Sequence, residues 1–136
     1  MRPIILGMCD PSGVEPLGLD QGGQAAGARL LALSGLAREE YEAAFERVNL
    51  IQDKVWRPIH ARLAGGRFYY EKPNGVPVLV LGREVWKALG LTPVRVFTRV
   101  GDYTLLPHPS GRNIELNKIW NKARVRSIMK RMAANA

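Results

Sequence analysis

A nearly continuous apolar run is the feature of this sequence that most restricts its fold. It extends from Val76 to Leu81 and contains only valine, leucine and Pro77. Strands that are buried on both faces, as in parallel sheets, have this composition, whereas strands with one solvated face alternate between apolar and polar residues. Helices must then cover both faces of the sheet that contains such a strand. The run therefore predicts an α/β fold.

Further strands and helices alternate along the chain, as judged from apolar spacing and from the positions of Gly and Pro. The predicted strands cover residues 3–8, 76–81, 94–99 and 104–106, with a short extended piece at 49–51. The predicted helices cover residues 25–36, 38–47, 53–63, 83–89 and 114–133. We expect Pro58 to interrupt the third helix and Gly65-Gly66 to begin a turn region. This alternation predicts a parallel or mixed sheet in a single domain spanning residues 1–136.

A single cysteine, Cys9, limits the covalent and metal chemistry of the chain. It excludes an internal disulfide, and one thiolate cannot hold a structural zinc or an iron–sulfur cluster. No apolar run reaches membrane-spanning length, and the first apolar residues are broken too soon for a signal-peptide core. We therefore expect a cytoplasmic protein with no cofactor or metal, no membrane contact and no obligate protein partner.

The charge of the chain is strongly basic and unevenly placed. Twenty Lys and Arg stand against twelve Asp and Glu, which gives a net charge of +8. No acidic residue follows Glu115, whereas the predicted C-terminal helix at about 114–133 is rich in Lys and Arg. A solvated helix face explains such a cluster as readily as a polyanion site does. Arg99 and Arg112 lie nearby in sequence and favour a nucleic-acid partner, here DNA.

Polar residues lie at the expected carboxyl ends of three extended segments. They occupy the segments Gly7–Pro11, Val48–Ile51 and Leu106–Asn113. Ligands of open α/β sheets bind at the carboxyl ends of the strands, so these segments are the expected place for a site.

The order and form of these segments resemble the uracil-DNA glycosylase superfamily. That superfamily has Gly-x-(Asp or Asn)-Pro after the first strand, an Asn at a later strand end and His-Pro-Ser after the last strand. The motifs are most similar to those of its single-strand-selective monofunctional branch. In this chain they read Gly-Met-Cys-Asp-Pro-Ser-Gly at 7–13 and His-Pro-Ser-Gly-Arg-Asn at 108–113, with Asn49 between them. The resemblance implies a three-layer α/β/α sandwich on a central, mainly parallel four-stranded sheet.

The resemblance also implies a role for each motif residue in removing uracil, or a 5-modified uracil, from DNA. Asp10 would activate the attacking water, and His108 would stabilise the leaving base. Asn49 would recognise the edge of the flipped-out base. The remaining base contacts would come from Met8, Cys9 and Ser12. The DNA backbone would be held by Ser110, Gly111, Arg112 and Asn113.

Each of these residues also has a structural explanation. Asp before Pro is a common turn former, and Ser12 fits the same loop. Asn49 can bond its own backbone, and Cys9 can be a small buried thiol rather than a nucleophile. His108 between prolines can be an exposed loop residue. The combination of motifs, rather than any single residue, favours the site.

Two departures from the family motifs keep other functions open. The stretch between Val14 and Arg29 contains no aromatic residue to stack on a base. Ser12 is small where the uracil-strict branch has a bulky ring, which favours a pocket open to 5-substituted pyrimidines. A non-catalytic nucleic-acid-binding module with the same fold is the main alternative. An unrelated nucleotide-binding or hydrolytic α/β domain is a weaker one, because the chain has no Walker, Gly-x-Gly-x-x-Gly or Gly-x-Ser-x-Gly motif.

Overall fold

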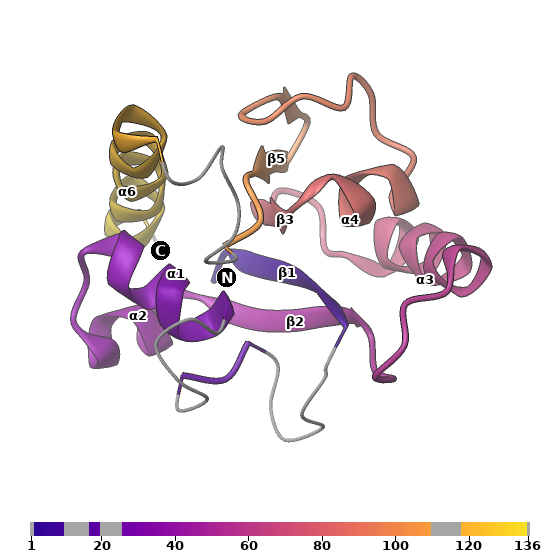
Figure 1. The fold of residues 1–136 in the computed structure, drawn as a ribbon, viewed down its shortest axis with the longest axis horizontal. Helices are drawn as coiled ribbons and strands as arrows, with labels where there is room; N and C mark the ends of the chain where they lie inside the picture. The colour runs from indigo at the N-terminus through magenta and orange to yellow at the C-terminus, as the bar shows by residue number, and fades with distance from the viewer. Residues whose placement is uncertain (1, 10–16, 20–25, 110–117, 136) are drawn as a thin grey trace.

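The computed structural model describes residues 2–9, 17–19, 26–109 and 118–135 (Figure 1). These described residues form a mixed sheet of five strands in the order β2-β1-β3-β5-β4, with helices packed against it. The strands are β1 (Ile4–Cys9), β2 (Glu46–Ile51), β3 (Val78–Leu81), β4 (Arg99–Val100) and β5 (Tyr103–Leu106). The α/β class predicted from the sequence is confirmed.

Strand pairing differs in part from the predicted mainly parallel four-stranded sheet. Strands β2, β1, β3 and β5 pair in parallel, and β4 is a fifth strand that pairs antiparallel with β5. The predicted strand at 94–99 is wrong except at its last residue, since β4 begins at Arg99. Phe97 has a φ of +67°, which breaks an extended chain, although its N–H still donates to the Leu105 carbonyl at 2.6 Å.

The core consists of two apolar clusters that receive alternate residues of the central strands. In β3, Val78 and Val80 belong to one cluster, whereas Leu79 and Leu81 belong to the other. All four side chains are buried, as the unbroken apolar run predicted. The first cluster includes Trp86, which is fully buried and donates its indole N–H to the Pro93 carbonyl at 2.9 Å. Loss of a core side chain of that size costs about 3–5 kcal/mol.

Each cluster is covered by its own set of helices (Figure 1). The helices are α1 (Ala26–Ser34), α2 (Arg38–Ala44), α3 (Pro58–Glu71), α4 (Arg83–Ala88) and α6 (Ile119–Ala134). Residues of α3 and α4 pack in the cluster that contains Val78, and residues of α1, α2 and α6 pack in the cluster that contains Leu79. Of the predicted C-terminal helix, residues 114–117 lie outside the described part of the chain.

Helix α3 differs most from the sequence prediction. It begins at Pro58 rather than being interrupted there, because the first helical position needs no N–H donor. It then continues through Gly65 and Gly66, where a turn was predicted. At Gly65 the helix lies so close to α4 that a Cβ atom would meet the Ala88 carbonyl oxygen at 2.1 Å. Glycine is retained in this helix because two backbones touch there, which outweighs its low helix propensity.

Lys72 fastens the end of α3 to the loops that precede β3 and β5. Its side chain is only 5% exposed. The ammonium group donates to the carbonyls of Pro73 and Val76 at 2.8 and 3.0 Å, and to Oδ2 of Asp102 at 2.9 Å. Because an ammonium has three donors, all of them are used. Lys72 therefore has a structural role, although the sequence alone suggests an ordinary surface charge.

Candidate functional site

Strands β1, β2, β3 and β5 run parallel, so their carboxyl ends lie together. We call this end of the sheet the carboxyl edge. Gly7 of β1 is level with Asn49 of β2, and Leu81 of β3 is level with Leu106 of β5. His108 follows two residues after Leu106. The residues at the start of the same strands form the opposite side, the amino edge. The described parts of the three segments singled out by sequence thus lie at one edge.

Asn49 is the most deeply buried polar side chain at the carboxyl edge. It is 3% exposed, and its Oδ1 has no hydrogen-bond partner within the described part of the chain. A Cβ atom at Gly7 would meet this oxygen at 2.7 Å, and it would meet Cδ2 of Leu17 at 3.1 Å. The amide therefore lies over Gly7, beside Leu17. A buried acceptor without a donor costs about 1–3 kcal/mol, which is a reason to expect a ligand donor there.

His108 lies at the same edge and packs on the backbone that follows β3. A Cβ atom at Gly82 would be 3.3 Å from both Cβ and Cδ2 of the histidine. Gly82 has φ +92° and ψ 159°, a combination that is nearly restricted to glycine. Burial lowers the pKa of His108, so the neutral imidazole is favoured near pH 7. Sequence reasoning missed Gly82, although a glycine between a buried strand and a helix was the available signal.

Met8 and Cys9 complete the described part of β1 at this edge. Both are half-buried and pack against the apolar cluster that α3 and α4 cover. The Cys9 thiol donates to the Lys54 carbonyl at 3.8 Å, which gives it a structural role in holding the segment after β2. A nucleophilic role for Cys9 gains no support from this contact, whereas the role of a small packed thiol does.

The other predicted site residues lie outside the described part of the chain. They are Asp10, Ser12, Ser110, Gly111, Arg112 and Asn113. Asp10 directly follows the last residue of β1, and Ser110 is the second residue after His108. Asn49 belongs to β2 and His108 follows β5, and strands β1 and β3 lie between these two. A ligand that touches both side chains must therefore extend across the ends of β1 and β3. Three strand spacings correspond to roughly 14 Å between the backbones of β2 and β5.

Aromatic residues outside the stretch between Val14 and Arg29 do not replace its missing base-stacking ring. Tyr41 and Phe45 are buried in the core, where they contact each other. Phe68 and Tyr69 pack on Tyr103, the first residue of β5 and thus part of the amino edge. Tyr70 follows them in α3 and is 91% exposed. None of these five described side chains supplies a ring beside Asn49.

Two further observations concern metal ligands and membrane-spanning helices. Within the described ranges, no three His, Cys, Asp or Glu side chains gather as metal ligands. No helix among the described residues is both long and apolar enough to cross a membrane.

Comparison of the chain with protein-family models, with curated proteins and with solved structures finds no match. The assignment of a function therefore depends on the geometry of the carboxyl edge and on the residues that surround it.

Proposed function

We propose that this chain is a metal-free, monofunctional DNA glycosylase that hydrolyses the bond between deoxyribose and uracil or a 5-modified uracil. One observation carries the proposal: Asn49 and His108, which are distant in sequence, lie at the same edge of the sheet, on either side of the strand that leads into Asp10. The proposal includes a three-layer α/β/α arrangement on the four parallel strands, with β4 as an addition at the rim.

The reaction requires charge stabilisation on both sides of the breaking bond. The C1′–N1 bond breaks with its electron pair going to the base, and a water oxygen forms the new bond to C1′. Positive charge grows on the sugar and negative charge on the base. In the proposed mechanism Asp10 accepts the proton of the attacking water and its charge stabilises the cationic sugar.

His108 is suited to the anionic side of this transition state. A neutral imidazole keeps one N–H donor, which can bond the carbonyl oxygen on which the base anion develops. The half-buried position of His108 and its lowered pKa favour the neutral form. The Gly82 backbone lies close to the ring and restricts it on that side, so the donor needs less reorganisation during the reaction.

Asn49 is suited to recognise the base itself. Uracil presents a carbonyl oxygen next to an imide N–H, and an amide side chain offers an acceptor and a donor in matching positions. The Asn49 Oδ1 without a partner supplies the acceptor for that N–H. Burial strengthens the bond, and it penalises any base that cannot donate at this position.

The basic surface of α6 supports a DNA substrate. Lys122 and Arg126 of α6 line a shallow groove together with Arg29 of α1. Ile119 and Trp120 at the start of the helix are 78% and 70% exposed. Cations and an exposed indole on one helix are the chemistry of a surface that binds phosphates and stacks bases.

Base excision from labelled oligonucleotides tests the proposal. Substrates contain uracil, 5-hydroxymethyluracil, hypoxanthine or thymine, in single and double strands. We expect uracil or a 5-modified uracil to be released, and His108→Ala to slow release about 10²–10³-fold, the usual effect of removing one transition-state donor. Asp10→Ala is expected to abolish release. His60→Ala, which removes the exposed histidine of α3, is the matched control and should leave the rate unchanged.

A non-catalytic nucleic-acid-binding module is the second candidate function. It is favoured by Leu17, an aliphatic side chain that lies against Gly7 as the Asn49 amide does, and by the absence of an aromatic residue from the sequence between Val14 and Arg29. No release from any substrate, together with binding that weakens steeply as salt is raised, would favour this function over the glycosylase.

A further inference from the structure

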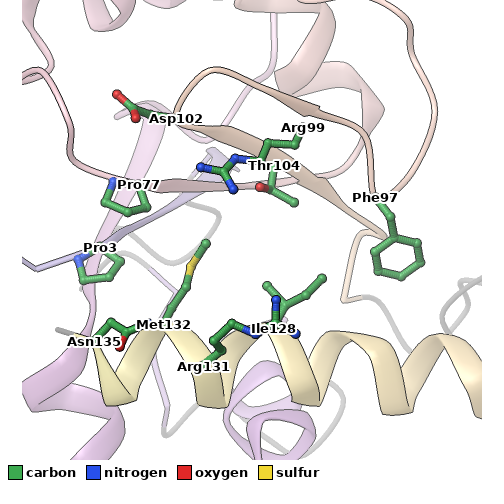
Figure 2. Close-up of a pocket in the computed structure, with 10 residues that line it drawn as sticks. All are labelled: Pro3, Pro77, Phe97, Arg99, Asp102, Thr104, Ile128, Arg131, Met132 and Asn135. Atoms are coloured by element: carbon green, nitrogen blue, oxygen red, sulfur yellow. The ribbon is translucent and has the colours of Figure 1, made fainter.

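A second candidate site lies at the amino edge, on the opposite side of the sheet from Asn49 and His108. It is a cleft of about 360 Å³ between α6 and the β4–β5 hairpin (Figure 2). Pro3 and Pro77, which precede β1 and β3, close one end of the cleft, and Phe97 closes the other. Its volume lies in the range of small-molecule sites.

The walls of the cleft are mainly apolar. Ile128 and Met132 of α6 form one wall, and Met132 points toward the strands in Figure 2. Phe97 lies beyond them, with the Arg124 guanidinium stacked 4.4 Å from its ring centroid. The Thr104 side chain, 8% exposed, adds one hydroxyl to the strand wall. A flat or compact apolar group fits such a space, with Thr104 as a hydrogen-bonding point.

Two arginines from different elements make the cleft cationic. Arg99 of β4 uses only Nε, which donates to the Gly101 carbonyl at 3.2 Å. Its terminal nitrogens have no partner among the described residues, and in Figure 2 they lie over Thr104 above the open space. Arg131 lines the helix side. Guanidinium groups bind carboxylate and phosphate oxygens in pairs, so their open nitrogens favour an anion.

Asp102, the acidic residue that lines the cleft, interacts with Arg99 electrostatically but is bound mainly by Lys72, so it does not cancel this charge. Its Oδ2 accepts from Lys72 at 2.9 Å and from the Gly75 N–H at 3.1 Å. The Lys72 hydrogen bond is the largest cause of a lowered pKa for Asp102. Since the Asp102 carboxylate is matched by the buried ammonium, the two arginines remain as net positive charge.

We propose that this cleft binds a small organic anion, with an apolar ring between α6 and the strands and a carboxylate or phosphate on Arg99 and Arg131. The site is separate from the carboxyl edge, so the proposal does not depend on glycosylase activity. A ligand in the cleft contacts both α6 and the sheet, and it therefore stabilises the docked position of the basic helix.

Titration of the folded protein with four benzene derivatives tests the proposal. Benzoate and phenyl phosphate carry the anion, whereas benzamide and benzylamine replace it with a neutral group and a cation. Amide chemical shifts of isotope-labelled protein give the site and the Kd together. We expect benzoate or phenyl phosphate to shift Thr104 and Met132, and to bind about tenfold or more tightly than benzamide. The relative affinity of the two anions distinguishes a carboxylate site from a phosphate site.

Three variants locate the binding. Arg99→Ala combined with Arg131→Ala is expected to weaken anion binding about tenfold or more and to leave benzamide unaffected. Met132→Trp fills the cleft and is expected to weaken all ring ligands. Arg62→Ala, which removes an exposed arginine from α3, is the charge-matched control. Equal binding of benzoate and benzamide, no effect of the double substitution, or no shift at about 10 mM ligand would each overturn the proposal.

Discussion

The two edges are opposite ends of the same four parallel strands, but the polar side chains found beside them are held in opposite ways. At the carboxyl edge, Asn49 is buried and His108 is half-buried, and each lies against a glycine. At the amino edge, Arg99 and Arg131 are exposed on the rim of an open cleft. Tight packing fixes the direction of a donor or acceptor, as a reacting group requires. Exposed cations on an apolar wall supply attraction with little positional restraint, which is enough for binding alone.

The largest expected difference between the edges is the loss of stability when a glycine with positive φ is replaced by alanine. Gly82 at the carboxyl edge has a glycine-only conformation and touches His108, whereas Gly101 at the amino edge has φ +57° and open space around it. Gly82→Ala is expected to lower the free energy of unfolding by about 3 kcal/mol, and Gly101→Ala by about 1 kcal/mol. Urea denaturation measures both. Equal losses would mean that the carboxyl edge is no more tightly restrained than the amino edge.

The next expected effect concerns one buried polar side chain at each edge, Asn49 and Thr104. Asn49→Leu removes an acceptor without a partner and is expected to raise the free energy of unfolding by about 1–2 kcal/mol, while base binding is lost. Thr104→Val at the amino edge is expected to change stability by less than about 1 kcal/mol. A stability gain with lost base binding would show that Asn49 is kept for a ligand. A loss of stability after Asn49→Leu would contradict that role.

The smallest expected effect concerns pH. Burial lowers the pKa of His108 below 6.5, so the unfolded chain binds the proton more tightly and stability declines as pH falls from about 6.5 through the folded pKa. The Lys72 bond lowers the pKa of Asp102 below 3.8, so its contribution is present above that pH and is lost only as pH falls through the folded value.

Urea denaturation at about pH 7.5, 5.5 and 3 separates the two groups. His108→Gln is expected to reduce the loss between the first two values, and Asp102→Asn the loss between the last two. A loss between pH 7.5 and 5.5 that persists in His108→Gln would assign it to another group.

The elements predicted best from the sequence are those whose side chains are all buried along their length. The Val76–Leu81 run is buried on both faces, and β3 forms there, followed by α4 at the predicted residue, Arg83. Strand β2 was missed in its first half, because Glu46 and Arg47 are polar and continue a helical pattern. Glu46 and Arg47 are tolerated because β2 is an outermost strand of the sheet, paired on one side only.

For the candidate site, the sequence predicted which residues lie at the ends of strands but not how their side chains pack. The motif pattern predicted that Asn49 and His108 lie at the carboxyl ends of strands, and parallel pairing then brings them to one edge. The contacts of Gly7 with Asn49 and of Gly82 with His108 depend on tertiary packing, which no local pattern encodes. The same is true of the cleft at the amino edge, whose residues come from both ends of the chain.

The buried Lys72 has a consequence for chemical footprinting of this basic protein. Reagents that acylate lysine report which ammonium groups contact a polyanion, because bound groups become protected. Lys72 should be protected whether or not a polyanion is present, since its three donors are already engaged within the chain. It is therefore an internal reference for such an experiment, and its reactivity reports unfolding rather than binding.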